Sequence, residues 1–383
     1  MKRIAISALS LTLLGAAVAA HAQSSVTLYG LIDDSIQFAH NANTNNQNFV
    51  GMVAGNLQGS RWGVKGSEDV GGGLKVIFQL ENGFNPNTGS LGQGNREFGR
   101  QAFVGLSSDQ FGTVTIGRQY DPVVDMVQNY TGENYLGSHF ATPGDVDNND
   151  NSSRTNNAVK FTSKTYAGLQ FEALYAFGGV AGSTGAGQTW SGAASYTNGG
   201  FGAAAGYILM DNASTLAGRT SGGVVGWGAG ATSDGTFDST INSAFASAKS
   251  IGIASVAAQY VVGPITGGIR YSNAQYKPDG FSTFTSTERF NVGAAFANYQ
   301  LTPAALLSLG YAFTHGSGDG PSATYNQISL GGDYNLSKRT DIYLVSAYQK
   351  ASGKGVTATA ADYGYPSNST SQELVTLGIR SKF

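Results

Sequence analysis

The chain has 383 residues and a net charge of −2, with 55 glycines, 19 tyrosines, 20 phenylalanines and no cysteine. The absence of cysteine excludes disulfide frameworks, thiol catalysis and cysteine-ligated metals. A net charge this close to zero provides no basic surface of the kind that nucleic acids require, so we predict no nucleic-acid partner. The aromatic content is too high for a disordered chain, and abundant glycine favours many short strands joined by turns.

The N-terminal residues resemble an export signal. Lys2 and Arg3 precede an apolar stretch, Ile4–Ala20, which ends in an A-x-A cleavage pattern. A retained membrane anchor is the alternative, but the apolar stretch is short and an alternating segment follows almost at once. No later run approaches the ~20 apolar residues of a transmembrane helix. We therefore predict a signal peptide over 1–22 and one β-barrel domain over 23–383.

From Ser24 onward, the hydrophobic pattern has a period of two. Val26 and Leu28 share one face of the first segment, whereas Asp33 and Gln37 share the other. Such alternation is typical of a strand whose two faces meet different surroundings. The same alternation recurs at 74–81, 169–177 and 289–296.

The connections between these segments alternate in length. Short turns are predicted at 67–73, 107–112, 163–168, 197–200, 262–264, 302–304 and 337–340. Long polar loops are predicted at 41–58, 86–96, 121–154, 179–187, 212–248, 277–286, 315–322 and 352–370. In an up-and-down sheet, all short turns then lie at one end and all long loops at the other, as in outer-membrane barrels.

Counting the segments between connections gives sixteen strands, although Gly, Ser and Thr blur the boundaries at 181–196 and 213–250. We predict an all-β fold, a transmembrane antiparallel β-barrel wide enough to leave an aqueous channel. A soluble β-sandwich or propeller is the alternative. It is less favoured because each strand carries an apolar, aromatic-rich face opposite a polar one that bears Arg, Lys and Glu.

The longest predicted connection, residues 121–154, has no strong helical or strand period. A loop of this length within a compact domain is usually functional. We predict that it folds into the bore and narrows it, so that its acids face arginines on the wall. A solvated surface loop is the alternative reading of its charges. The acids are Asp125, Glu133, Asp145, Asp147 and Asp150, and the wall residues are Arg61, Arg100 and Arg154.

Five stretches in this order resemble the general diffusion porins of Gram-negative outer membranes. They are SSVTLYGLID, GSRWGVKGSEDVGGGLKVIFQLENGF, RQAFVGLSSDQFGTVTIGRQYD, RTNNAVKFTS and LVTLGIRSKF. The resemblance implies a sixteen-stranded barrel, a homotrimer in the lipid of the outer membrane, and a third loop folded into the pore. It implies passive passage of small hydrophilic solutes and ions, with no cofactor.

The resemblance also implies the residues of the pore constriction. GSRWGVKG, GRQAFVGL and SRTNNAVKF carry Arg61, Arg100 and Arg154, and Arg118 resembles a further arginine near the pore. Members of the family place acids in a Pro-Glu-Phe-like tract of the third loop, whereas this chain reads DMVQNYTGENYLG. Asp125 and Glu133 are the candidate acids here.

Side-chain parity independently places these basic residues inside the barrel. If Trp62 and Phe103 face outward, they turn Arg61 and Arg100 inward. If Val159 and Phe161 face outward, they turn Arg154 and Lys160 inward. The sequence leaves open whether these basic residues or the acids set the ionic preference of the pore.

Two further motifs bear on ligands and assembly. The run DVDNNDNSS places Asp145, Asp147 and Asn149 at alternate positions, as in a calcium loop. It lacks the glycine at position six and the glutamate at position twelve, so we predict no metal site. The terminal Phe383 resembles the assembly signal of outer-membrane barrels, and without that resemblance it is an aromatic residue of the interfacial girdle.

An outer-membrane barrel enzyme is the main functional alternative. Such enzymes need a histidine near a serine or carboxylate. After the signal peptide the chain has only His40, His139 and His315, all in predicted loops, and it has no G-x-S-x-G or H-E-x-x-H motif. We predict that the protein is not an enzyme. An adhesin or phage-receptor role for the long loops is compatible with a pore.

Overall fold

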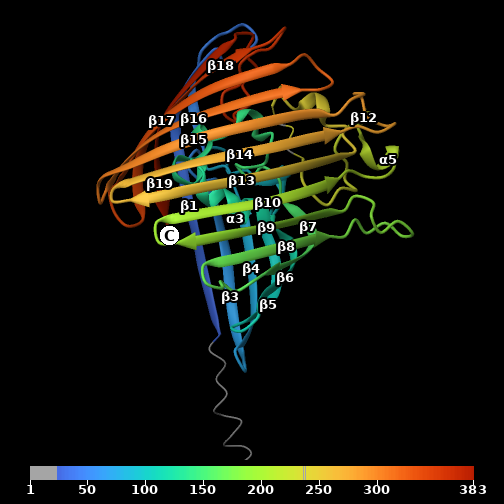
Figure 1. The fold of residues 1–383 in the computed structure, drawn as a ribbon, viewed down its shortest axis with the longest axis vertical. Coiled ribbons are helices and arrows are strands. Elements are labelled where there is room, and N and C mark those ends of the chain that lie inside the picture. The colour runs from blue at the N-terminus through green and yellow to red at the C-terminus, as the bar shows by residue number, and fades with distance from the viewer. Residues whose placement is uncertain (1–23, 236, 238) are drawn as a thin grey trace, which may run out of the picture.

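The strands close into one antiparallel barrel in the computed structural model, which describes residues 24–235, 237 and 239–383 (Figure 1). The predicted signal peptide, residues 1–22, lies outside the described residues. The barrel strands are β1 (Ser25–His40), β2 (Phe49–Ala54), β3 (Arg61–Gly71), β4 (Leu74–Gly83), β5 (Gln101–Ser108), β6 (Gly112–Gln119), β7 (Thr155–Thr162), β8 (Leu169–Ala176), β9 (Thr189–Asn198), β10 (Phe201–Asp211), β13 (Ser250–Val262), β14 (Ile265–Lys277), β15 (Glu288–Thr302), β16 (Ala305–Ser317), β17 (Ala323–Asn335), β18 (Thr340–Ser352) and β19 (Ser371–Lys382).

Seventeen strands occupy sixteen positions around the barrel. β1 closes the ring against β19, and its other edge pairs with β3 over 25–31 and with β2 over 34–39. β2 and β3 therefore share one position, which confirms the predicted sixteen. The prediction of one loop over 41–58 was wrong where β2 lies. Between β2 and β3 the chain turns inward, because the backbone N–H groups of Leu57 and Gln58 both donate to Asp33 Oδ2 at 2.8 Å.

Outward and inward side chains alternate along the strands. On β16, Leu307 and Leu309 are half exposed on the outer face, whereas Ser308 is buried. Val104 and Leu106 are likewise the outward residues of β5, so Phe103 faces inward and the parity predicted for it was wrong. Arg100 nevertheless lies inside, because it precedes β5 in an irregular backbone where Phe98 has a φ of 53°. The apolar outer band is the surface that lipid covers.

The long connections carry short helices and one small hairpin. The helices are α2 (Gly92–Asn95), α3 (Pro122–Val127), η1 (Gln128–Tyr130), α4 (Glu133–Leu136), η2 (Gly137–Phe140), η3 (Pro143–Asp145), α5 (Leu216–Arg219) and η4 (Ser243–Phe245). None of the helices within the described residues is long and apolar enough to cross a membrane. The hairpin pairs β11 (Thr220–Ser221) with β12 (Val224–Val225).

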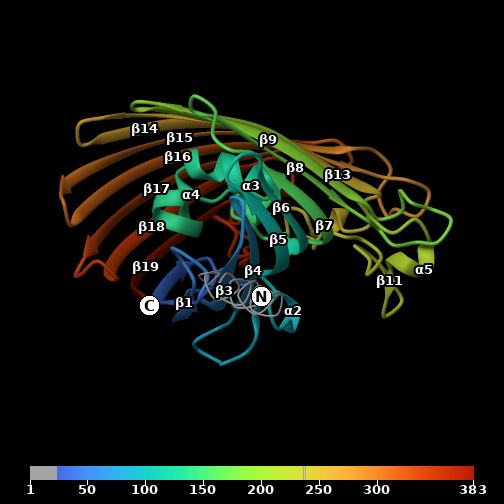
Figure 2. The ribbon, with the colours of Figure 1, turned by 90° about the horizontal axis from the view of Figure 1, so that it is seen from below.

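Three connections fill the interior of the barrel: the one between β6 and β7, the one between β10 and β13, and the one between β18 and β19. Helices α3 and α4 lie on the concave side of the sheet (Figure 2). They belong to the inner loop, residues 121–154. Asn242 Nδ2 donates to Gly144 O at 2.7 Å, and Gly144 N donates to Ala361 O at 2.9 Å. These hydrogen bonds join the inner loop to the β10–β13 connection and to the β18–β19 connection. They position the site described below.

The C-terminal residue joins the two ends of the barrel wall. Phe383 N donates to Gly30 O at 2.9 Å, and Gly30 N donates to Phe383 O at 3.0 Å. The ring lies over Gly30, where an added methyl group would come within 2.5 Å of Phe383 Cζ. The C-terminus therefore closes the β1–β19 seam.

We expect deletion of Phe383 to lower the yield of assembled barrel without changing the conductance of the channels that form, because Phe383 lies at the end of the wall, half exposed. Heat-modifiability on gels during refolding measures assembly, and single-channel recording measures conductance. Phe383→Tyr, which keeps the aromatic ring and both backbone bonds, is the control. Normal assembly kinetics of the deletion variant would show that Phe383 is only a girdle aromatic.

Candidate functional site

The inner loop begins with a well-capped helix. The Asp121 carboxylate accepts hydrogen bonds from Val123 N at 2.8 Å and Val124 N at 3.3 Å, and Pro122 occupies the first turn. These residues are typical of a helix start, because they satisfy N–H groups that have no partner within the helix. Burial and the neighbouring Asp125 raise the pKa of Asp121 to about 6. The helix start thus fixes where the chain leaves β6 for the interior.

Glycines on the inner wall receive the side chains of this loop. Leu136 packs over Gly331, where an added methyl group would lie 2.2 Å from Leu136 Cδ1. Phe140 packs over Gly310 in the same way, at 2.6 Å from the position of such a methyl group. Leu136 is fully buried. The wall therefore has recesses that fit side chains of the inner loop. This fit fixes the position of the loop along the barrel axis and its rotation about that axis.

The middle of the inner loop is held by a buried histidine. His139 Nδ1 lies 2.9 Å from the Tyr363 hydroxyl and His139 Nε2 lies 2.9 Å from Thr376 Oγ1. Its carbonyl oxygen accepts from Ser329 Oγ at 2.6 Å. Burial lowers the pKa of His139 to about 3, so the ring is neutral at ordinary pH. This histidine connects the inner loop to β19, to β17 and to the loop before β19.

The buried histidine predicts an acid-dependent loss of stability. In the unfolded chain histidine titrates near a pKa of about 6.5, so between pH 6.5 and 3 the unfolded state binds a proton that folded His139 does not. The stability that His139 contributes is complete above pH 6.5, falls by roughly 1.4 kcal/mol per pH unit between pH 6.5 and 3, and falls no further below pH 3. We expect His139→Asn to lose this part of the acid sensitivity.

Unfolding in detergent at pH 7 and pH 4.5 measures the effect, and the exposed His40→Asn is the matched control. Parallel loss of stability in the parent and the His139 variant would contradict this prediction.

Two buried basic residues neutralise the acids on the outer side of the inner loop. Arg270 on β14 pairs with Asp147 at 2.6 Å and with Glu133 at 3.4 Å. Lys160 on β7 pairs with Asp125. The candidate acids Asp125 and Glu133 thus have partners other than the predicted arginines, and the buried Glu133 needs such a partner. These pairs attach the inner loop to the wall.

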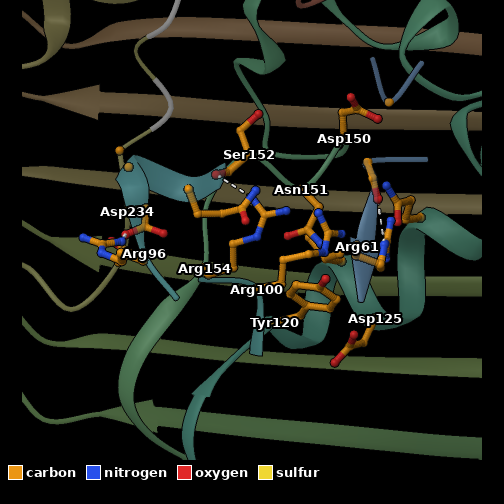
Figure 3. Close-up of a pocket in the computed structure, with 18 of the residues that line it drawn as sticks. Arg61, Arg96, Arg100, Tyr120, Asp125, Asp150, Asn151, Ser152, Arg154 and Asp234 are labelled. Carbon is orange, nitrogen blue, oxygen red and sulfur yellow. Dashed lines mark hydrogen bonds and ion pairs between the residues drawn. The ribbon is translucent and has the colours of Figure 1, made fainter. Parts of the chain in front are cut away.

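A cavity of about 900 Å³ lies beside the inner loop, inside the barrel. Arg61, Arg100 and Arg154 line it together with Arg96 from the loop after β4 (Figure 3). The side chain of Tyr120 lies among them. Its ring centre is 5.7 Å from Arg100 Cζ and 5.6 Å from Arg154 Cζ. The aromatic face thereby stabilises two guanidinium groups that would otherwise repel one another.

A wall carboxylate balances part of this positive charge. Glu81 on β4 accepts from Arg100 Nε at 2.9 Å and lies 3.9 Å from Arg61. The hydroxyls of Tyr29 and Tyr120 also donate to Glu81, at 2.8 Å and 3.0 Å. One carboxylate thus serves two arginines, which leaves a net positive charge on this part of the cavity.

Arg154 differs from the other arginines of the cavity because it forms no ion pair among the described residues. Its Nη1 donates to Ser152 O at 2.9 Å, but its buried Nε has no hydrogen-bond partner among the described residues. Burial and the neighbouring Arg100 lower the pKa of Arg154 to about 10, so the group stays protonated at pH 7. A buried cation without a carboxylate attracts mobile anions from the water in the cavity.

The structure brings together some of the predicted site residues and separates others. Those that line the cavity are Arg61, Arg100, Arg154, Asp125 and Glu133. Arg118 and Lys160 do not line it. Arg118 lies at the irregular end of β6, where the pairing with β7 shifts register between Gly117 and Gln119, and it pairs with Asp234.

Four residues around the cavity were missing from the predicted site. Glu81 could have been found, because the alternation of β4 turns it inward toward Arg61 and Arg100. Tyr120 and Arg96 lie outside any strand, and their directions depend on how the loops fold. Asp234 belongs to a Gly- and Ser-rich stretch in which the sequence carries no periodic signal.

A closed barrel with an apolar outer face and a charged, loop-filled interior defines the class of outer-membrane β-barrels. A family model described as Gram-negative porin matches residues 5–354, and the chain belongs to this family. This confirms the resemblance seen in the sequence and places the protein in the outer membrane.

Similar proteins include two outer membrane porins. A porin protein of Bordetella pertussis is 39% identical over 180 residues, covering 43% of this chain and 46% of that protein. Outer membrane porin protein 32 of Delftia acidovorans is 33% identical over 178 residues, covering 45% of this chain and 49% of that protein. The chain thus spans about half the length of these relatives.

The solved structures extend the comparison to the whole barrel. An anion-selective porin from Comamonas acidovorans has a TM-score of 0.74 at 24% identity and covers 94% of this chain and 100% of that chain. At this identity the match shows the fold, and it confirms the predicted class of barrel.

Proposed function

We propose that the protein is a general diffusion porin, a water-filled channel through which small hydrophilic solutes and ions pass passively. The observation that carries this proposal is the cavity of about 900 Å³ inside the barrel, lined by charged and amide side chains. Such a lining allows hydrated solutes to pass, whereas apolar solutes gain nothing from it. The size of the opening and the charges on its lining filter the solutes.

We further propose that the inner loop narrows this channel and that the arginines make it prefer anions. Two acids that line the cavity, Asp125 and Glu133, are paired with Lys160 and Arg270. Burial and the nearby Asp362 raise the pKa of Asp150 well above its usual range, which favours its uncharged form. The arginine cluster then dominates the potential.

Single-channel recording in planar bilayers tests both proposals. Stable ion-conducting steps are expected from the purified barrel. In a gradient of potassium chloride, the reversal potential should have the sign of chloride preference. The gradient should be kept below about 0.1 M, where the Debye length is about 10 Å or more. Absence of conducting steps would refute the channel, whereas a cation-preferring reversal potential would refute only the assigned sign.

We infer that the barrel has no catalytic role. Both ring nitrogens of the buried His139 are engaged by Tyr363 and Thr376, and His315 Nδ1 is engaged by Thr324. None of these partners is a carboxylate, so neither histidine has the arrangement of a general base oriented by an acid. Hydrolysis of ester, peptide or phospholipid substrates by the purified barrel would contradict this inference.

We also propose a homotrimer, as the family resemblance implies. The apolar outer band provides the area that neighbouring barrels and lipid would cover. A trimer should migrate as a large band before boiling and as a monomer after it. A monomer-sized band in both samples, together with a monomeric mass in mild detergent, would refute the proposal.

A further inference from the structure

A segment of the loop between β10 and β13 forms one side of the cavity. This strap, residues 226–235, contributes Trp227, Ser233 and Asp234 to the lining. It lies against the start of β7. Asn156 N donates to Thr232 O at 2.7 Å, and Asp234 N donates to the carbonyl oxygen of Arg154 at 2.9 Å. The strap is therefore a fixed part of the wall.

Further bonds hold the strap without using the side chain of Asp234. Ser153 Oγ donates to Asp234 O at 2.7 Å, and Trp227 Nε1 donates to Ser233 O at 2.9 Å. Thr232 Oγ1 donates to Thr189 Oγ1 at 2.8 Å. Because the backbone is held in this way, the Asp234 carboxylate can be changed with little movement of the strap.

The Asp234 carboxylate lies between two guanidinium groups. Arg96 Nη1 donates to Asp234 Oδ1 at 2.6 Å, and Arg118 Nη2 donates to Oδ2 (Figure 3 shows the Arg96 contact). Arg118 has other partners, Gly99 O at 2.8 Å and Asn156 Oδ1 at 2.7 Å. The Arg96 side chain is about half exposed and lines the cavity. One negative charge thus faces two positive charges, which leaves a net charge of +1 on this group.

We propose that Asp234 is a second selectivity-determining residue, which sets the charge on the strap side of the channel by neutralising one of two arginines. This inference rests on the proposed channel function. Asp234 and Arg96 lie on the far side of Arg154 from Arg61 and Arg100 (Figure 3). Arg61 and Arg100 on the wall form one charged region of the channel, and Arg96 with Asp234 on the strap forms a second. Each region acts on the ions that pass through the channel.

Substitutions that remove one charge each test this proposal, because they should shift the permeability ratio in opposite directions. Asp234→Asn leaves both arginines and raises the local charge by one, so the anion-to-cation permeability ratio should rise about two-fold at low salt. Arg96→Gln lowers the local charge by one and should decrease the ratio by a similar factor. The double variant has the parent's charge and should recover the parent's ratio. Reversal potentials of single channels in bilayers measure all three.

A matched control separates charge from loop movement. Asp279 forms a bidentate pair with Arg219 at 2.8 Å, which tethers the same loop outside the cavity. Asp279→Asn removes the same charge and should leave the ratio unchanged. The proposal is overturned if Asp234→Asn has no effect, if Asp279→Asn has an equal one, or if the double variant does not return to the parent value. Failure of the parent to conduct refutes the channel itself.

Discussion

Arg154→Ala is expected to lower the anion-to-cation permeability ratio of the channel by about four-fold. Arg154 forms no ion pair among the described residues, so no paired carboxylate cancels its charge toward ions in the cavity. A unit charge about 10 Å from an ion in water contributes about 0.4 kcal/mol, of opposite sign for anions and cations, so the ratio of their local concentrations changes about four-fold. Reversal potential at low salt is the measurement, because at about 1 M salt the Debye length is only about 3 Å.

Two controls separate charge from shape at this position. Arg154→Lys keeps the charge and should keep the parent's preference, whereas Lys354→Ala removes a charge from an outer loop and should change little. Arg100→Ala should also reduce anion preference. It leaves Glu81 with Arg61 at 3.9 Å as its remaining basic partner, so the net charge of this group falls from +1 to zero. If both alanine variants keep the parent's selectivity, the arginine cluster is not the filter.

Gly331→Val is expected to release the inner loop from the wall. The recess at Gly331 holds Leu136, and a side chain there would overlap it and also meet Val345 Cγ1 at 3.0 Å. Overpacking a well-packed site costs roughly 1–3 kcal/mol, which raises the undocked population of the loop about 5- to 150-fold. We expect a larger mean conductance, frequent substates and a weaker ionic preference, because the loop no longer holds one position.

A wall glycine with open space around it is the control for this experiment. Gly293 on β15 has no atom within 4 Å of the position where a side chain would begin, so Gly293→Val should leave conductance unchanged. Adding Leu136→Ala to Gly331→Val removes the overlapping side chain. The double variant should therefore show fewer conductance substates than Gly331→Val alone. A quiet parent-like channel from Gly331→Val alone would show that the loop is not held by this recess.

Much of the barrel could be predicted from alternation, because a strand with lipid on one side and water on the other has a strict period of two. The prediction failed where the backbone leaves that period. β2 was predicted to be part of a long loop, whereas β3 was predicted as a strand. The inward turn that separates them depends on hydrogen bonds to the buried Asp33, which no local pattern in the sequence reveals. Phe103 was placed outside because an aromatic residue suits both the lipid face and a packed interior, so QAFVGL alone does not decide between Phe103 and Val104.

The arginines of the site could be predicted, whereas their partners could not. Arg61 begins β3, and Arg100 and Arg154 immediately precede β5 and β7, whose starts the sequence reveals. Ion pairs across the interior join residues remote in sequence, such as Arg270 and Asp147, which are 123 positions apart. No local pattern links such residues, because the folded path of the inner loop brings them together.

The β11–β12 hairpin has a practical consequence for protein engineering. Its two turn residues, Gly222 and Gly223, have φ angles of 58° and 82° and no atom within 4 Å of where a side chain would begin. The Arg219–Asp279 pair anchors the chain just before the hairpin, and the strap begins just after it. A foreign peptide grafted between these glycines would be displayed on the cell surface, while the anchored segments on either side keep it out of the path of the permeating solutes.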